Sequence, residues 1–434
     1  MNIAPFAARR ARLLSAMGRG VAVVPTAPER LRNRDSHYPY RHDSYFYYLT
    51  GFPEPEAVLV LIAGDAPQAL LFCRDKDPDK EVWDGFRHGP QGACAQFGFD
   101  AAFPIATFDA RLAELLADQP VLHASLGHDA AWDARILAAL NGTRGMVRNG
   151  VRAPAEIVDV RVALDEMRLL KDEAERDSMR RAARISAAAH GRAMGFAAPG
   201  RHEYEVEAEL LHEFRRHGAP APAYNTIVAG GANACILHYV DNDRVLCDGE
   251  LLLIDAGCEV DSYAADITRT FPVNGRFSPA QKDVYALVLA AQAAAIARVA
   301  PGNAWDAPHE AALRILAQGM LDLGLLAGSV DGIIESGAYK RFYMHRTGHW
   351  LGMDVHDAGE YKVGGSWRPL QPGMTLTVEP GCYIRAADDV PPALWNIGVR
   401  IEDNVLVTDD GCEILTLDAP KEIAAIESLM ARHR

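Results

Sequence analysis

The sequence predicts two domains in one chain, an α/β domain at the amino end followed by an α+β domain. Its 434 residues exceed the roughly 250–300 at which a single hydrophobic core stops growing. The first third alternates apolar strand-like runs with helical patterns, and the remainder spaces short apolar runs by turns around longer helical stretches. The composition, with 49% apolar and 24% charged residues, is that of a globular protein.

Alternation of strands and helices characterises the first domain. Residues 57–62 and 69–72 are continuous apolar runs, whereas residues 110–117 have a helical pattern of apolar positions. This alternation is typical of an α/β layer, so we expect a sheet with helices packed on it.

A lapse in the apolar periodicity separates the two domains. Around residues 148–154 the pattern gives way to turn residues, and a charged helical pattern then runs from about residue 164 to residue 194. Two further helical stretches, near residues 279–299 and 307–325, interrupt the short strands of the second domain, which therefore reads as α+β. The predicted domains are 1–158 and 159–434.

The surplus of acidic residues limits the possible partners. With 44 basic and 58 acidic side chains the formal charge is −14, which disfavours nucleic acid and anionic membrane surfaces as partners. The most apolar long stretch, residues 286–300, is shorter than the ~20 residues needed to span a bilayer. The seven cysteines form no CxxC pair, which favours a reducing cytoplasm.

Two aspartates occupy neighbouring strand-like segments. Residues 251–258 form an apolar strand that contains Asp255, and residues 263–271 form a second strand that contains Asp266. If the two strands pair across the intervening turn, both carboxylates can lie on one face, because alternate residues of a strand share a side. Taken alone, an aspartate near a glycine at a strand end is more often a turn residue than a metal ligand.

Three histidines and two glycines lie within the short segment 345–357. The segment is not the helical HExxH zinc motif, because Arg346 stands where that motif needs glutamate and Gly348 weakens a helix. A single histidine in such a segment would more often be structural, but three together indicate a site. The histidines are His345, His349 and His356.

Two glutamates follow apolar strand segments. Glu379 ends an apolar run that a Pro-Gly pair stops, and an unpaired acid there would be costly. The segment 398–407 begins by alternating, so that Arg400 and Glu402 share one face of a strand. A solvated strand face explains this last pair equally well when it is taken alone.

Together these residues predict a metal site. Four carboxylates and one imidazole carry four negative charges, which balance two divalent cations. Ligands so rich in oxygen favour Mn²⁺, with Co²⁺, Zn²⁺ and Fe²⁺ as alternatives. The five candidate ligands are Asp255, Asp266, His349, Glu379 and Glu402.

The order D-x10-D, H, E, E over residues 251–402 resembles the metallopeptidases with the pita-bread (creatinase/aminopeptidase-like) fold. That family includes methionine aminopeptidase, prolidase and aminopeptidase P. The string at residues 38–57 resembles the first domain of aminopeptidase P, so the resemblance spans nearly the whole chain. It implies a pita-bread catalytic domain and hydrolysis of the bond before a proline at the second position of a peptide. Two alternatives stay open: a prolidase that cleaves Xaa-Pro dipeptides, and a non-catalytic binding protein of the same fold.

The resemblance also implies roles for the five ligands. Asp266 and Glu402 would bridge the two metal ions, Asp255 would complete one ion, and His349 with Glu379 would complete the other. A water shared by both ions would supply hydroxide near neutral pH. Glu379 would act as the proton shuttle between this water and the proline nitrogen.

Further residues gain roles by the same resemblance. His238 and His356 would donate hydrogen bonds to the substrate carbonyl as charge develops on it. His345, Tyr361 and Arg400 would form walls of the proline pocket. Relatives are often homodimers or homotetramers in which the first domain reaches a neighbouring site, and the candidate contacts here are Asp35, Trp83 and Arg148.

Overall fold

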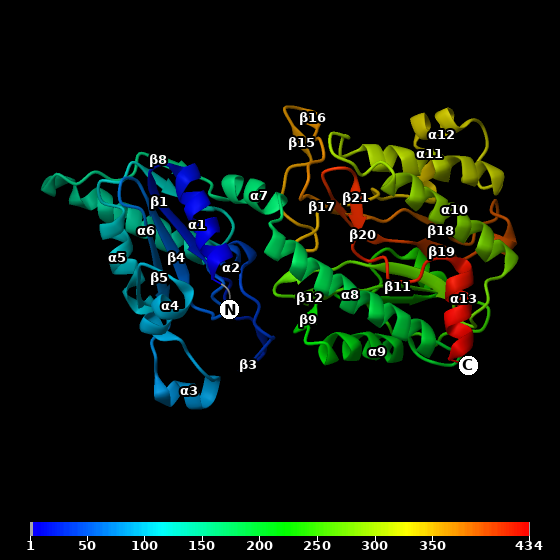
Figure 1. Ribbon diagram of the computed structural model, residues 1–434, viewed down its shortest axis with the longest axis horizontal. Helices are drawn as coiled ribbons and strands as arrows, with labels where there is room; N and C mark the ends of the chain where they lie inside the picture. The colour runs from blue at the N-terminus through cyan, green and yellow to red at the C-terminus, as the bar shows by residue number, and fades with distance from the viewer. Residues whose placement is uncertain (1–2, 434) are drawn as a thin grey trace. The chain divides into compact units, whose positions relative to one another are not determined.

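The computed structural model describes residues 3–433 and divides into two compact units, Met1–Asp165 and Glu166–Arg434. The division falls within helix α7 (Arg161–Leu169), whereas the sequence placed the expected boundary between residues 158 and 159. Most helices and strands of both units are labelled in Figure 1.

The first unit contains a six-stranded mixed sheet. Its strands, in sheet order, are β6 (Ala101–Pro104), β5 (Gln68–Cys73), β4 (Val58–Ala63), β1 (Gly20–Pro25), β7 (Val121–His123) and β8 (Glu156–Val158). Strands β1, β4 and β5 pair antiparallel, and the remaining pairs are parallel. A separate hairpin joins β2 (Leu31–Asn33) to β3 (Ser36–His37). The apolar runs predicted to be strands are β4 and β5.

Helices cover both faces of this sheet. On one face Val58 packs in a common core with Leu112 of α5 and Leu140 of α6. On the other face Leu59 and Leu61 are fully buried, and α1 and α2 contact β4 (Figure 1). Burial on both faces explains why these strands are apolar throughout, and the predicted α/β class is confirmed. The helices are α1 (Ala4–Met17), α2 (Ser44–Thr50), α3 (Pro78–Asp84), α4 (Gly89–Phe97), α5 (Phe108–Leu115) and α6 (Ala130–Gly145).

The second unit is built on several short antiparallel sheets. One contains β10 (Ile227–Gly230), β11 (Leu251–Asp255) and β14 (Thr268–Pro272), and another contains β13 (Tyr263–Ala264), β12 (Cys258–Val260) and β9 (Ala221–Pro222). A third contains β17 (Thr375–Val378), β20 (Asp403–Val407) and β21 (Cys412–Ile414). Two-stranded pairs are β18 (Gly381–Ile384) with β19 (Ile397–Arg400), and β15 (Lys362–Val363) with β16 (Ser366–Trp367).

Helices flank these sheets, which gives the predicted α+β class. Helices α8 and α9 lie on one side of the strands and α10 and α11 lie on the other (Figure 1). Within the described residues 3–433, no helix has both the length and the apolar character that crossing a membrane requires. The helices are α8 (Glu173–Phe196), α9 (Glu203–Arg216), α10 (Pro279–Ile296), α11 (Ala307–Asp322), α12 (Val330–Ser336) and α13 (Ile423–Arg432).

The single helix predicted from about residue 164 to 194 is wrong, because the chain forms two helices there. The Asp172 side chain accepts a hydrogen bond from the Glu175 N–H, and the Glu175 side chain accepts one from the Asp172 N–H. This reciprocal cap starts α8 anew after α7 has ended. The helices predicted near residues 279–299 and 307–325 are α10 and α11, and both are confirmed.

Candidate metal centre

The two aspartates lie where a strand pair is interrupted. Strand β11 pairs with β14 so that Asp255 lies opposite Thr268, and Asp266 lies just outside this regular pairing. A side chain on Gly257 would place its Cβ 1.8 Å from the Ala265 carbonyl oxygen, so only glycine allows this close approach. The hairpin predicted from the sequence is present, and the interruption frees the Asp266 carboxylate from the pleat of β14.

The two glutamates lie at a second interruption of the same kind. Strands β17 and β20 pair as far as Val378, and β18 and β19 pair from Gly381 onward. Glu379 and Glu402 occupy the gap, one on each segment of chain. The Thr268 hydroxyl donates to Glu402 Oε2 at 2.7 Å and so ties this strand pair to the pair that carries the aspartates.

His349 lies on a loop that is held against β17. Its backbone N–H donates to Thr377 Oγ1 at 3.1 Å, and a Cβ on Gly348 would lie 2.1 Å from the Thr377 carbonyl oxygen. His349 Nδ1 lies 2.9 Å from the Trp350 carbonyl oxygen, which favours a proton on Nδ1. The other ring nitrogen, Nε2, then faces Asp266 Oδ2 at 3.4 Å.

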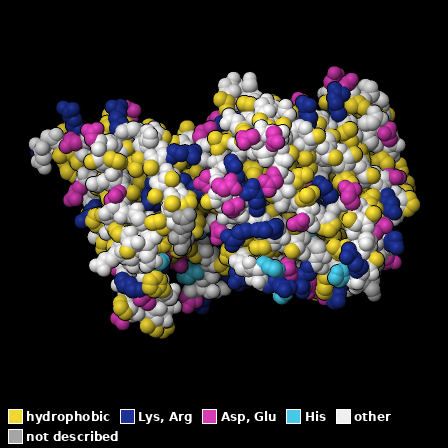
Figure 2. Space-filling view, in the orientation of Figure 1, with side chains coloured by type: hydrophobic (Ala, Val, Ile, Leu, Met, Phe, Trp, Pro, Cys, Tyr) yellow, Lys and Arg dark blue, Asp and Glu magenta, His cyan; other side chains and the backbone are white. Residues whose placement is uncertain are grey.

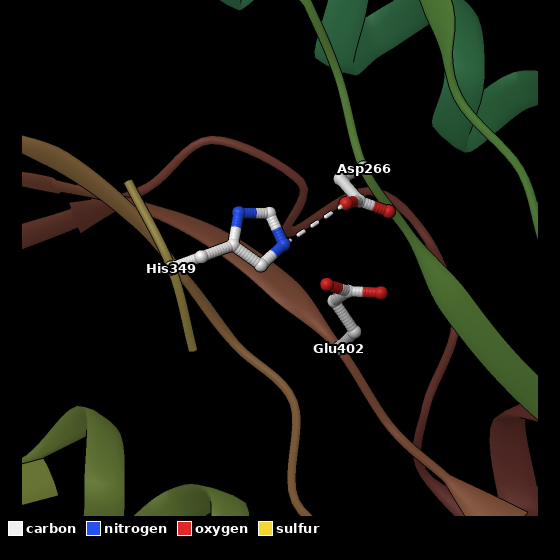
Figure 3. Close-up of side chains that lie close together, drawn as sticks. All are labelled: Asp266, His349 and Glu402. Atoms are coloured by element: carbon white, nitrogen blue, oxygen red, sulfur yellow. Dashed lines mark ion pairs between the residues drawn. The ribbon is translucent and has the colours of Figure 1, made fainter. Parts of the chain in front are cut away.

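Three of the five candidate ligands converge closely. Asp266, His349 and Glu402 each offer one ligand atom, and these atoms lie within 4.8 Å of one another. Figure 3 shows the three side chains pointing toward a common space, from chain segments far apart in the sequence. Glu379 adjoins the group, because its Oε1 lies 3.7 Å from His349 Nε2.

Tyr224 brings Asp255 into the same cluster. Its hydroxyl lies 2.6 Å from Asp255 Oδ1 and 2.6 Å from Asp266 Oδ1, and it can donate its proton to only one of them at a time. Sequence reasoning missed Tyr224, which no motif distinguishes. It also missed Thr268, although its position two residues after Asp266, at the start of β14, was a usable signal.

Crowding of buried carboxylates raises their pKa values. Burial, helped by the charges of Asp266 and Asp255, raises the pKa of Glu379 to about 7 against the opposing charges of His349 and Arg400. For the same reasons the pKa of Glu402 lies well above its ordinary value, and that of Asp255 is also raised. Carboxylates held together at this cost fit a site that binds cations.

The pKa values of His349 and Asp266 are shifted so that both groups favour their charged forms. Burial would lower the pKa of His349, but its hydrogen bond to Asp266 and the charges of Glu379 and Asp266 raise it to about 9. Burial would raise the pKa of Asp266, but the pairing with His349 lowers it. The cluster therefore attracts positive charge, which here is a proton on His349 and which a metal ion would replace.

Arg400 contacts the carboxylate cluster directly. The side chain is buried, and its Nη2 lies 2.6 Å from Asp255 Oδ2. Nη1 donates to the Tyr383 hydroxyl at 3.1 Å, and Nε donates to Thr268 Oγ1 at 3.0 Å. Tyr383 is a further residue that sequence reasoning missed.

The remaining histidines surround the cluster. The ring of His356 lies edge-on to the ring of His349, with centroids 4.3 Å apart, and the His356 side chain is exposed. His238 is exposed in the turn after the short 3-10 helix at Gly231–Cys235. Burial, with the charge of Arg400, lowers the pKa of His345 to about 3, and burial, with the charge of His349, lowers that of His356.

Tyr361 packs in an aromatic group. Its ring lies parallel to that of Trp350, with an interplanar angle of 2° and centroids 5.6 Å apart, and it also contacts Trp305. Its hydroxyl accepts a hydrogen bond from the Trp350 N–H at 3.3 Å. This hydroxyl thus contacts the backbone beside His349 and supports the loop that carries this ligand.

A buried cluster of carboxylates with one imidazole, on an α+β unit that follows an α/β unit, defines a metallopeptidase. Residues 177–409 match Metallopeptidase family M24, and residues 6–123 match the Aminopeptidase P, N-terminal domain. The chain belongs to the Xaa-Pro aminopeptidases of metallopeptidase family M24. It is an enzyme of the hydrolase class, and the predicted family and fold class are confirmed.

Known relatives agree over the whole chain. The Xaa-Pro aminopeptidase of Haemophilus influenzae is 47% identical over 98% of this chain and 96% of its own. The Xaa-Pro aminopeptidase of Escherichia coli is 44% identical over 99% of this chain and 98% of its own. The structure of Pseudomonas aeruginosa aminopeptidase PepP superimposes with a TM-score of 0.98 at 52% identity, covering 100% of this chain and 99% of that one.

Proposed function

We propose that this enzyme binds two divalent metal ions and uses them to hydrolyse the first peptide bond of peptides whose second residue is proline. The observation that carries the proposal is the buried cluster of four carboxylates and one imidazole, three of whose ligand atoms lie within 4.8 Å of one another. The substrate class comes from the relatives of Haemophilus influenzae and Escherichia coli, which are named Xaa-Pro aminopeptidases.

Five side chains would hold the two ions. Asp266 and Glu402 would bridge them, Asp255 would complete one, and His349 with Glu379 would complete the other. The four carboxylates balance the charge of two divalent cations, and the raised pKa values of Glu379 and Glu402 fit a site that needs such charge. The donor set, rich in oxygen, favours Mn²⁺. Zinc, cobalt and iron are alternatives, and for zinc a zinc-substituted form of the Escherichia coli aminopeptidase P is known.

When bound, two such cations lower the pKa of a shared water far below its bulk value, so that hydroxide is available near neutral pH. Glu379 takes the proton of that water and delivers it to the proline nitrogen, which must be protonated to leave as an amine.

Two exposed histidines would serve the substrate carbonyl. His238 and His356 donate hydrogen bonds that strengthen as the oxygen becomes negative in the transition state. His345, Tyr361 and Arg400 would form the walls of the proline pocket. The hydrogen bond that Arg400 donates to Asp255 and the one that the Tyr361 hydroxyl accepts from the Trp350 N–H support this role, because they fix both side chains.

The cellular compartment and the oligomeric state of the enzyme are also proposals. Its cysteines are free thiols, which suits a reducing cytoplasm. A homodimer or homotetramer is proposed, with Asp35, Trp83 and Arg148 as candidate contacts. All three side chains are exposed, and Trp83 is 87% exposed, which is unusual for so large an apolar side chain.

The test is removal and return of metal. Protein stripped by a chelator and verified as metal-free should lose hydrolysis of Ala-Pro-Ala, and Mn²⁺ should restore most of it with two ions bound per chain. Released alanine is measured by mass spectrometry, and metal is measured by elemental analysis. Full activity in the verified metal-free protein would contradict the proposal. Full activity with only one Mn²⁺ bound per chain would contradict the need for a second ion.

A further inference from the structure

His356 lies on a loop that is tied down on both sides. The N–H of Asp357 donates to the Trp350 carbonyl oxygen at 3.0 Å and closes the loop at its base. The Gly352 carbonyl oxygen accepts from the Ala264 N–H at 2.8 Å and fastens the loop to β13. The backbone on either side of His356 is therefore fixed, although its side chain is exposed.

A buried ion cluster lies behind this loop. Asp357 Oδ1 accepts from Arg168 Nη2 at 2.6 Å, and its Oδ2 accepts from Lys171 Nζ at 2.9 Å. All three side chains are only 1% exposed. Arg168 also donates to Asp354 at 2.7 Å, on the other side of His356. Arg168 comes from α7 and Lys171 from the link between α7 and α8, and the two anions flank the histidine.

The carboxylate of Asp357 fits closely against the loop. A Cβ on Gly352 would lie 2.1 Å from Asp357 Oδ2 and 3.0 Å from Lys171 Cε, so the backbone passes directly over the ion pair. Burial raises the pKa of Asp357, but Lys171 and Arg168 outweigh burial and lower it. Asp357 is therefore a charged anion at neutral pH, held at two oxygens.

Burying these charges is a poor way to gain stability, because desolvation cancels much of the attraction. It does fix position, since each oxygen of Asp357 has one cationic partner and only one geometry satisfies both. The preceding residue, His356, has its ring centroid 4.3 Å from that of the candidate ligand His349. A shift of Asp357 would carry the His356 ring away from the reacting carbonyl.

We propose that Arg168, Lys171 and Asp357 form a positioning cluster that sets His356 for its hydrogen bond to the substrate carbonyl. The inference rests on the proposed function of His356 and extends it to residues that do not touch substrate. Misplacing a catalytic group by about 1 Å from a distance costs up to about 10²-fold in rate. Loss of one cation of the cluster should therefore lower kcat rather than raise KM.

The test is a double-mutant cycle with Lys171→Met and His356→Ala in the metal-loaded enzyme. Lys171→Met keeps the length of the side chain and leaves Asp357 paired with Arg168. We expect it to lower kcat for Ala-Pro-Ala about tenfold in the parent and less than about twofold in the His356→Ala background, because coupled residues are not additive. Asp357→Asn should show the same coupling.

The control is Arg180→Met, which removes ion pairs to Glu173, Asp177 and Glu413 in the same unit and touches none of the three residues of the cluster. Hydrogen exchange supplies a readout that does not depend on activity. Peptides that cover residues 350–358 should exchange faster in Lys171→Met than in the parent, and Arg180→Met should leave them unchanged.

Equal losses of kcat in both backgrounds, or no loss in the parent, would overturn the positioning role. Unchanged exchange of residues 350–358 in both Lys171→Met and Asp357→Asn would overturn it without any reference to turnover. Failure of the proposed function has a different signature, since the parent would not cleave Ala-Pro-Ala or His356→Ala alone would have no effect. The metal content and melting temperature of each variant show whether a loss of activity comes from misfolding. If Asp357→Asn misfolds, the milder Lys171→Met decides whether the cluster positions His356.

Discussion

Arg400 Nη2 donates to Asp255 Oδ2 across 2.6 Å, so the arginine that the sequence suggested for the substrate pocket contacts a candidate metal ligand. The same guanidinium donates to Tyr383 and Thr268 and is buried. Thr268 in turn donates to Glu402, which extends the connection to the second strand pair. Arg400, on β19, is thus hydrogen-bonded to residues of three other strands, β11, β14 and β18.

The first prediction concerns this link. Arg400→Lys should lower kcat/KM for Ala-Pro and Ala-Pro-Ala by similar factors and should weaken metal binding, because a lysine cannot reproduce three directed bonds. Steady-state kinetics on both peptides and metal titration of the stripped protein check this. A loss confined to the dipeptide would instead identify Arg400 as a clamp for a free substrate carboxylate.

The second prediction concerns the hydroxyl shared by two aspartates. Tyr224→Phe removes only the oxygen that lies 2.6 Å from Asp255 and Asp266, so metal affinity should fall about 10- to 100-fold, as is usual when a group that orients a ligand is lost. Competition with a metal-sensitive dye measures the affinity. The control is Tyr263→Phe, which removes a 2.9 Å bond to Glu175 outside the cluster. Equal effects in both variants would mean that Tyr224 does not orient the ligands.

The third prediction follows from the shifted pKa values. Burial raises the pKa of Glu379 from 4.5 to about 7, so the metal-free folded state binds an extra proton over that interval and its stability falls as the pH rises through it. The pKa of His349 is raised from 6.5 to about 9, so its stabilisation is complete below 6.5 and lost as the pH rises through 9. Both effects make the metal-free enzyme less stable at pH 8.5 than at pH 5.5.

Thermal unfolding of stripped and Mn²⁺-loaded protein between these pH values measures the effect. The increase in melting temperature on metal binding should be larger at pH 8.5, where the carboxylates of the metal-free site repel one another. Glu379→Gln cannot ionise and should flatten the pH dependence of the metal-free protein. A metal-free melting temperature that rises with pH would contradict the assigned pKa directions.

The fold could be predicted where the pattern of apolar residues is decided by burial alone. Strands β4 and β5 were predictable because they are buried on both faces and are apolar throughout. The division between α7 and α8 was not, because the charged helical pattern continues through it. The new start is marked by the reciprocal bonds of Asp172 and Glu175. In the sequence this cap leaves only a short signature, an acid followed three residues later by glutamate, which the continuing helical pattern obscures.

The candidate ligands could be located because each acid interrupts an apolar segment, where an unpaired charge would be costly. Residues that support the ligands could not be found in this way. Tyr224 reaches the cluster from the segment between β9 and β10, and Tyr383 reaches it from β18, four residues after Glu379; neither tyrosine stands out in the sequence on its own. Their contacts depend on how three strand pairs meet, which local patterns do not encode.

The last prediction separates an aminopeptidase from a dipeptidase: Ala-Pro-Ala should be cleaved with a higher kcat/KM than Ala-Pro at the same pH and with the same metal. A dipeptidase must capture a free carboxylate just beyond the proline, ideally with an arginine placed for two parallel hydrogen bonds. In this structure Arg400 directs its Nη2 to Asp255 and its Nη1 to Tyr383, so it is already committed within the cluster. The match of residues 6–123 to the aminopeptidase P amino-terminal domain supports the same choice. If the dipeptide is preferred by tenfold or more, about 1.4 kcal/mol of transition-state binding, the enzyme has prolidase specificity and the proposed substrate is wrong.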